Sequence, residues 1–343
     1  MFKRRTLFIV GAGASAEVKF DIGWQLAQKI ADNMRPARGE RRHEATIKDD
    51  FLLDEFRRRV GHDKGYQDFM EAARRIHEGI ELTHSVDDFL NVHQQDPLIV
   101  EIGKAAIIRA VLQAEKDCTM YVDHSNAFNR LSFRDIADTW FVKLMRVLAP
   151  GSGPQAAADA FHNVTFIVFN YDRCLEHFLE YAISSLYGID RMRARQMVSQ
   201  FRIIHPYGTI GDLDSLPFGG ERGKDYAVLP RVERIRTYAE QFADKTELMM
   251  MRNEVVTAGC IVFLGFSYLE QNMKLLEPPA KMKWKPIFGT AWKMSDHSVN
   301  VVAEDILSMF DPSMIDSNSI VELNNKLKCA ELFDHYARSL NAA

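Results

Sequence analysis

Polar residues follow two short apolar runs of the sequence, at the points where those runs end. Asn170 and Asp172 come directly after "VTFIVF", and His205 ends the run "FRIIH". An amide can donate and accept hydrogen bonds at once, which suits holding a hydroxyl, a carboxamide or an attacking water. An imidazole with an unperturbed pKa of about 6.5 can act as a general base. These three residues are therefore candidate catalytic residues.

Each of the three also has a structural explanation. Asn and Asp are common in turns and as helix N-caps, so Asp172 is equally well explained as the cap of a helix beginning near Cys174. A lone His is more often structural than catalytic. Pro206 keeps His205 extended at the end of its run. If both runs are parallel strands, their polar ends meet at the ligand-binding edge of one sheet, which favours a functional role.

The stretch "LFIVGAGAS" places Gly11, Ala12, Gly13 and Ser15 at a strand-to-helix junction. Glycines there let backbone N–H groups approach a phosphate, and the amino end of the following helix adds a favourable dipole. The G-x-G-x-x-G fingerprint is incomplete, because Ala16 occupies its third glycine position. The structural alternative is a tight turn that needs glycine for close packing.

Two later runs end in the same way. "IVFLGFSYLEQN" carries Gly265 and Ser267, which suit close approach and hydrogen bonding to a phosphate or ribose, although Ser267 could also cap the next helix. "PIFGTAW" adds Gly289 and Thr290. "SVDDFL", from Ser85, predicts an N-cap followed by an acidic first turn.

The elements that position these residues are five short, β-rich apolar runs. They are "TLFIV" from Thr6, "VTFIVF" from Val164, "FRIIH" from Phe201, "CIVFLGF" from Cys260 and "KPIFGTAW" from Lys285. Several are almost continuously apolar, as parallel strands covered on both faces are. Helical patterns fall between them, which predicts an α/β fold with a doubly wound parallel sheet.

A long stretch of helical pattern separates the first two runs, far more than the dozen or so residues that a crossover needs. We therefore expect residues 35–154 to form an inserted helical subdomain, with a polar loop over 35–49 and a linker "PGSGPQAAA" from Pro150. We expect residues 1–34 and 155–295 to form the sheet domain. Residues 296–343, with "VNVVAEDILSMF" and "IVELNNKLKCAELFDHYARSL", are expected to form two C-terminal helices and a candidate assembly surface.

Composition narrows the choice of function. The 343 residues carry a net charge of −4, which gives no whole-chain signal for nucleic acid or an anionic membrane. No apolar run has transmembrane length, and the signal-like start has too short an apolar core. The four cysteines are scattered without C-x-x-C spacing, so we expect no zinc ribbon, no disulfide framework and a cytoplasmic protein.

Taken in order, "GAGAS", "SVDDFL", "FNYD", "HPYG" and "LGFS" resemble the sirtuin superfamily, and within it the zinc-less sirtuin-like NADase domains of bacterial antiphage defence. The resemblance spans roughly residues 6–295. It implies a Rossmann-like fold and an NAD site. It assigns catalysis to Asn170, Asp172 and His205. It assigns NAD binding to Gly11, Ala12, Gly13, Ser15, Gly265 and Ser267.

Three departures from the sirtuin pattern restrict the activity. The four-cysteine zinc module is missing, and "VKFDIGW" stands in place of the "GIPDFR" cofactor loop, without its Arg. His205 is followed by Pro206-Tyr207-Gly208 and not directly by Gly. The first two departures argue against protein deacylation, because the acyl-peptide cleft of sirtuins adjoins the zinc module.

The resemblance implies an NAD+ hydrolase in which NAD+ is the substrate and zinc is not required. Cleavage of the nicotinamide–ribose bond passes through an oxocarbenium-like centre. His205 would accept a proton, Asn170 would position water or ribose, and Asp172 would orient the site. Such a defence enzyme needs regulation, by homo-oligomer assembly or by a partner such as a co-encoded HerA-type ATPase. A non-catalytic module that binds NAD or ADP-ribose within a defence complex is the alternative.

Overall fold

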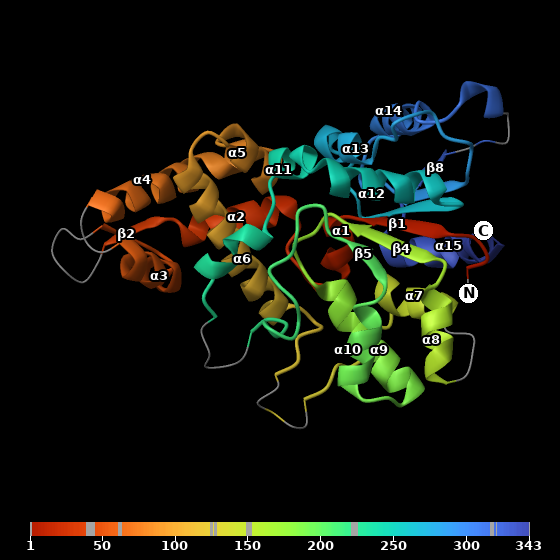
Figure 1. The fold of residues 1–343 in the computed structure, drawn as a ribbon, viewed down its shortest axis with the longest axis horizontal. Helices are drawn as coiled ribbons and strands as arrows, with labels where there is room; N and C mark the ends of the chain where they lie inside the picture. Colours follow the sequence, from red (N-terminus) through yellow and green to blue (C-terminus); the bar gives the residue numbers. More distant parts are fainter. Residues whose placement is uncertain are drawn as a thin grey trace. The chain divides into compact units, whose positions relative to one another are not determined.

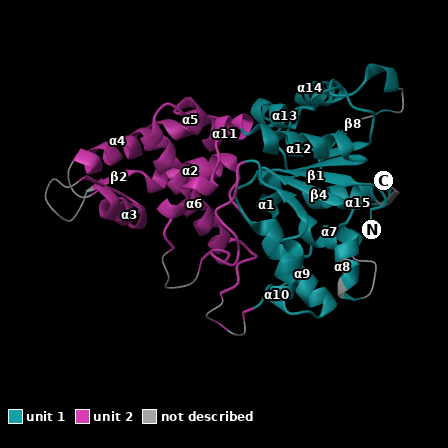
Figure 2. Cartoon of the chain, viewed as in Figure 1, with its two compact units in different colours: residues 1–19, 130–206, 244–343 teal, residues 20–129, 207–243 magenta. Residues whose placement is uncertain are grey.

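The computed structural model describes residues 2–38, 45–60, 64–123, 126, 129–148, 153–220, 226–315, 319 and 321–342 (Figure 1). The chain divides into two compact units, each made of discontinuous segments (Figure 2). Unit 1 consists of Met1–Lys19, Arg130–Pro206 and Asp244–Ala343. Unit 2 consists of Phe20–Asn129 and Tyr207–Ala243.

Unit 1 contains a six-stranded parallel sheet in the order β5-β4-β1-β6-β7-β8. Its strands are β1 (Thr6–Val10), β4 (Val164–Val168), β5 (Arg202–Ile204), β6 (Cys260–Leu264), β7 (Ile287–Thr290) and β8 (Val321–Asn324). Counted along the chain within this sheet, the order is the 3-2-1-4-5-6 of Rossmann-like folds. The predicted fold class is confirmed. The strand order reverses between β1 and β6, where ligands bind in folds of this kind.

The three central strands form the core of unit 1. All residues of β1, β4 and β6 are buried, as their almost continuously apolar sequences predict. Val10 pairs with Val168 on one side and with Leu264 on the other, so the three strands end level with one another. The residues that follow these strands are therefore neighbours at one edge of the sheet.

Helices cover both faces of the sheet. Figure 1 shows α12, α13 and α14 on one face and α7, α8, α9 and α15 on the other. The helices of unit 1 are α1 (Ala12–Ser15), α7 (Trp140–Leu148), α8 (Pro154–Phe161), α9 (Cys174–Tyr187), α10 (Arg191–Val198), α12 (Lys245–Thr257), α13 (Glu270–Leu276), α14 (Asp296–Leu307) and α15 (Cys329–Ala342), with the short 3-10 turns η1 (Ala16–Val18) and η4 (Pro312–Met314).

The two predicted C-terminal helices are present as α14 and α15, but the second is shorter than predicted. "VELN" forms β8, the edge strand beside β7, and the helix starts only at Cys329. A helix is prevented from starting earlier by Asn324, whose Oδ1 accepts hydrogen bonds from the N–H groups of Lys326 and Leu327 and turns the chain. The strand is half-buried and partly polar, so it lacks the apolar run that marks the central strands.

Unit 2 is mostly helical. Its elements are α2 (Gly23–Asn33), α3 (Asp50–Val60), α4 (Lys64–Gly79), α5 (Val86–Val92), α6 (Pro97–Asp117) and α11 (Tyr238–Ala243), the 3-10 turns η2 (Ile80–Leu82) and η3 (Leu229–Arg234), and the antiparallel pair β2 (Pro36–Arg38) and β3 (Ala45–Ile47). The pair β2–β3 lies where a polar loop was predicted, and that prediction is wrong for these residues. The predicted helix start is confirmed, since Ser85 Oγ accepts a hydrogen bond from Asp88 N–H at 3.1 Å.

The unit boundaries differ from the division expected from sequence. The predicted insertion began at residue 35 and ended at 154, whereas α2 belongs to unit 2 and α7 belongs to unit 1. Trp140, at the start of α7, explains this second placement, because its indole N–H donates to Ala14 O at 2.9 Å. Residues 150–152 of the predicted linker lie outside the described part of the chain, and residues 154–158 of it form the start of α8. Among the described residues, no helix is long and apolar enough to cross a membrane.

Candidate functional site

A chain of side-chain hydrogen bonds joins the ends of β1 and β4. Asn170 Nδ2 donates to Gly11 O at 3.2 Å and to Ser15 Oγ at 3.0 Å. Ser15 Oγ in turn donates to Asp172 Oδ2 at 2.9 Å. All three polar side chains are buried. The structure therefore brings together Ser15, Asn170 and Asp172, which sequence reasoning picked out separately.

Asp172 also bonds the start of the helix that follows, although the N-cap residue of that helix is Arg173. Asp172 Oδ1 accepts a hydrogen bond from the N–H of Cys174, the first residue of α9, at 3.0 Å. Burial raises the pKa of Asp172, while the hydrogen bonds from Cys174 and Ser15 oppose that shift. The carboxylate of Asp172 therefore has two roles: Oδ1 bonds the first N–H of α9, and Oδ2 bonds Ser15.

His205 lies directly after β5, and both of its ring nitrogens are engaged. Nδ1 is 3.1 Å from the backbone oxygen of Asn170, and Nε2 is 2.7 Å from Glu176 Oε1. Burial alone would lower the pKa of His205, but the Glu176 carboxylate outweighs it and raises that pKa. For Glu176, burial acts to raise the pKa, and the charge of His205 outweighs this and lowers it. These opposite shifts favour the ionised form of both groups, an imidazolium paired with a carboxylate.

This pairing changes what His205 can do. Both of its neighbours accept hydrogen bonds, so both ring nitrogens carry protons while Glu176 is ionised. An imidazolium has no lone pair to offer an attacking water, so His205 is not a free base in this arrangement. The open acceptor of the pair is Glu176 Oε2, which is buried without a hydrogen-bond partner in the described part of the chain.

Glu176 is the residue that sequence reasoning missed. It lies in the first turn of α9, where an acidic side chain is already explained by the helix dipole. Its partner His205 is 29 residues further along the chain. The available signal was a glutamate one turn beyond Asp172, facing the same strand end, but the pattern alone did not connect it to His205.

The glycines of the first turn serve the packing of β1 against β6. Gly11 N–H donates to Leu264 O at 2.9 Å, and Gly13 N–H donates to Gly265 O at 3.0 Å. A Cβ on Gly11 would lie 2.6 Å from Gly265 O. Gly265 has a φ of +56°, and its Cβ would lie 2.1 Å from Ala14 N. The two glycine amides are thus used within the protein, and α1, which Ala12 opens, has only four residues to contribute a dipole.

The remaining predicted residues surround this turn. Thr290 is buried, and its Oγ1 accepts a hydrogen bond from Gly265 N–H at 2.8 Å, so it holds the turn in place. A Cβ on Gly289 would lie 2.7 Å from Tyr268 Oη, which gives this glycine a packing role. Ser267 is exposed, and it does not cap the next helix, because α13 begins only at Glu270.

Metal-type ligand sets are not found in the described ranges, where no three His, Cys, Asp or Glu side chains gather as they would around an ion. The cysteines are all buried and unbridged: Cys118, Cys174, Cys260 and Cys329. Burial raises the pKa of Cys260 to about 12, so that thiol is not a nucleophile at neutral pH.

Unit 1 is a Rossmann-like α/β protein with a buried, hydrogen-bonded polar cluster at the carboxyl ends of β1, β4 and β5. We call Ser15, Asn170, Asp172, Glu176 and His205 the polar cluster below. Neither a scan against protein-family models nor a search of curated proteins finds a match to this chain. The sirtuin-like resemblance therefore rests on the motifs, and the chemistry of the site rests on its geometry.

Proposed function

We propose that the chain is an NAD+ glycohydrolase that cleaves the nicotinamide–ribose bond and releases nicotinamide and ADP-ribose. The observation that carries the proposal is the polar cluster itself. It joins residues from three strand ends beside the β1–β6 switch point, where Rossmann-like folds bind dinucleotides. The ordered sirtuin-like motifs support the same substrate, because three of them supply members of the polar cluster.

The polar cluster suits this reaction chemically. Nicotinamide leaves as a neutral base, so the enzyme does not have to protonate it. The enzyme has to hold the ribose and present a water to the oxocarbenium-like carbon. In our proposal Asn170 positions that water or a ribose hydroxyl. Ser15 and Asp172 act as positioning residues, because they fix the Asn170 amide through the hydroxyl of Ser15.

The attacking water must lose one proton when it forms its bond to the ribose carbon. We assign this proton to the Glu176–His205 pair and not to His205 alone, because both nitrogens of His205 already carry protons in the ion pair. Glu176 Oε2 offers the open acceptor. The pair then holds one more proton until the product leaves and solvent removes it. This proposal adds Glu176 to the catalytic set expected from sequence.

Both ring nitrogens of His205 are hydrogen-bonded within the protein, and this favours a second candidate function. In that function the chain is a module that binds NAD or ADP-ribose without cleaving it. A histidine held by two acceptors is well suited to a fixed structural or binding role. The two candidates differ in one outcome, since a binding module would retain intact NAD+ and a hydrolase would not.

We further propose, from the resemblance, that the activity serves antiphage defence in the cytoplasm. It would be switched on by homo-oligomer assembly or by a partner such as a co-encoded HerA-type ATPase. Activity would then depend on protein concentration or on the partner. Size-exclusion chromatography alongside activity measurements tests this, and a strict monomer with full activity at every concentration would contradict it.

The direct test of the proposed function incubates the purified chain with NAD+ and separates the products by chromatography. We expect equal amounts of nicotinamide and ADP-ribose to accumulate. Saturable binding of NAD+ with no nicotinamide released, under assembly conditions and with the genomic neighbours present, would support the binding module and overturn the hydrolase.

A further inference from the structure

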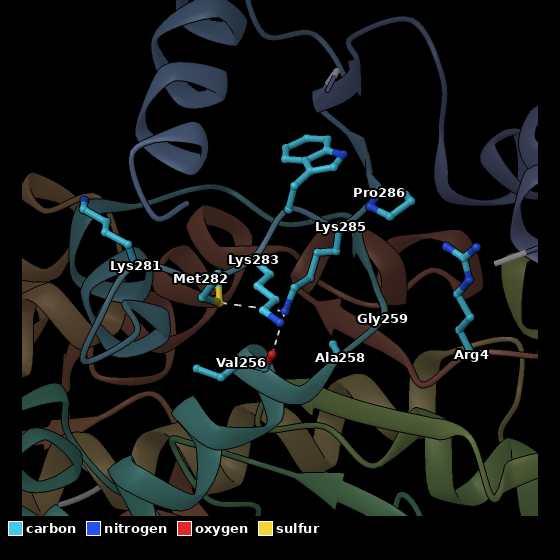
Figure 3. A pocket seen from close by; sticks show the side chains of 10 residues that line it. Arg4, Val256, Ala258, Gly259, Lys281, Met282, Lys283, Lys285 and Pro286 are labelled. Atoms are coloured by element: carbon cyan, nitrogen blue, oxygen red, sulfur yellow. Dashed lines mark hydrogen bonds between the residues drawn. The ribbon is translucent and has the colours of Figure 1, made fainter. Parts of the chain in front are cut away.

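A cavity of about 530 Å³ lies in unit 1, at the opposite edge of the sheet from the polar cluster (Figure 3). Its walls include residues that precede three strands: Arg4 before β1, Gly259 before β6 and Pro286 before β7. Because these strands are parallel, their amino ends lie at one edge and their carboxyl ends at the other. The cavity shares no residue with the polar cluster and is a separate feature of the molecule.

The cavity is strongly cationic. Ten residues line it, and the basic ones among them are Arg4, Lys281, Lys283 and Lys285, while none of the ten is acidic. Arg4, Lys281 and Lys283 are exposed, and the Lys281 ammonium also donates to the backbone oxygen of Ser308. Gly259 leaves room for the Arg4 side chain, since a Cβ there would lie 3.1 Å from Arg4 Cβ. In a protein of net charge −4, this concentration of positive charge is local.

Two negative groups near the cavity, the carboxyl end of α12 and the Glu254 carboxylate, are compensated by basic side chains. Helix α12 ends here, and Lys285 Nζ donates at 2.8 Å to the carbonyl oxygen of Val256 (Figure 3) and, also at 2.8 Å, to that of Val255. Desolvation lowers the pKa of Lys285 to about 8, so the ammonium stays largely charged at neutral pH. Glu254 on the same helix is bonded to Arg5 Nη2 at 2.6 Å. Neither the helix end nor this carboxylate is left to repel an anion.

Trp284 adds a planar apolar surface to the cavity wall. Its ring is half-buried, and its centroid lies 5.1 Å from that of Phe310, which holds it in place. Guanidinium and ammonium groups bind phosphate, and an indole face stacks on a nucleobase. The volume suits one small ligand, since such sites measure about 300–1,000 Å³. A nucleic-acid strand would need a longer basic track.

We propose that this cavity binds a nucleotide, with its phosphates on Arg4 and Lys283 and its base against Trp284. The site does not depend on NAD+ cleavage at the other edge of the sheet. It would give the protein a second nucleotide site, which a ligand could occupy while the polar cluster holds its own substrate.

Titration calorimetry with two probes, ADP and inorganic phosphate, tests the proposal. The cavity variant is Arg4→Gln/Lys283→Gln. Its matched control is Arg193→Gln/Lys326→Gln, which removes one exposed Arg and one exposed Lys elsewhere in unit 1 and leaves the same net charge. Any ADP bound near the polar cluster is common to all the proteins, so the difference between variant and control isolates the cavity.

We expect the cavity variant to bind ADP at least about tenfold more weakly than the control, because two charge-assisted contacts are lost, and we expect the affinity of the unaltered protein to fall with salt. Trp284→Leu should weaken ADP binding severalfold and leave phosphate binding unchanged. Equal ADP affinity of cavity variant and control would overturn the site. ADP binding that Trp284→Leu leaves unchanged would overturn the nucleotide assignment, because the cavity would then hold phosphate alone.

Discussion

His205 Nε2 and Glu176 Oε1 lie 2.7 Å apart at the carboxyl edge of the sheet, and the two side chains are 10% and 22% exposed. The histidine is held on its other side by the backbone oxygen of Asn170. The ion pair connects the end of β5 with the first turn of α9, and the hydrogen bond of His205 Nδ1 connects both with the end of β4. The ion pair fixes the protonation state of the residue that the sequence marked as a base.

Glu176→Gln should change the pH dependence of stability. The raised pKa of His205 stabilises the fold below the unfolded value of 6.5, and this is lost as the pH rises through the folded pKa. The lowered pKa of Glu176 stabilises the fold above 4.5, and this is lost as the pH falls. The stability gap between wild type and variant should be widest between pH 4.5 and 6.5. We expect it to reach about 2 kcal/mol there.

Urea unfolding followed by circular dichroism across this pH range measures that gap. Glu304→Gln, at an exposed position on α14, is the matched control and should give a small, pH-independent difference. A gap for Glu176→Gln that stays constant from pH 4 to pH 9, to within about 0.5 kcal/mol, would show that the two residues are not an ion pair.

Ser15→Ala should destabilise unit 1 by about 1–3 kcal/mol, because it leaves the buried amide of Asn170 and one oxygen of Asp172 without their shared partner. Ser199→Ala removes an exposed hydroxyl that bonds only Gln196 O among the described contacts, and it should cost less than about 0.5 kcal/mol. The midpoints of chemical denaturation compare the two. Equal effects would mean that the Ser15 hydroxyl does not link the other two side chains.

Gly265→Ala should destabilise the protein by about 2–4 kcal/mol, because the residue combines a φ of +56° with a Cβ position 2.1 Å from Ala14 N. Gly23→Ala is the control. No heavy atom lies within 4 Å of its Cβ position, and it opens α2, so alanine should be neutral or stabilising by up to about 1 kcal/mol. Thermal unfolding measures the stability of both variants. A Gly265→Ala protein as stable as the Gly23→Ala protein would contradict the close packing of Gly265 against the turn that contains Gly13.

The central fold was predictable because β1, β4 and β6 are buried on both faces and their sequences are almost uniformly apolar. β8 was not, because an edge strand is half-exposed and its sequence also fits a helix. Four members of the polar cluster, Ser15, Asn170, Asp172 and His205, were predictable as polar groups near strand ends. Glu176 and the hydrogen bonds that join the cluster were not. Ser15 and Asp172 lie 157 residues apart in the chain. No local sequence pattern indicates that these two side chains are in contact.

The same limit applies to the glycines. The sequence predicts that Gly11 and Gly13 occupy a strand-to-helix turn, and the structure has them there. The sequence does not indicate which residues pack against this turn. Gly11 and Gly13 lack side chains because the backbone of Gly265 lies against them. This contact requires β6 to pair with β1, and these two strands are far apart in the sequence.

The measurement that tests the account most directly is the rate of nicotinamide release from NAD+ by wild type, Asn170→Ala and His205→Ala. Asn253→Ala and His297→Ala change the same residue types at exposed positions and serve as controls. We predict wild-type rates for both controls and a loss of about a hundredfold or more for both site variants, as expected for removal of a positioned proton-transfer or water-holding group. Turnover by Asn170→Ala and His205→Ala at the wild-type rate would contradict the assignment of the polar cluster as the catalytic site.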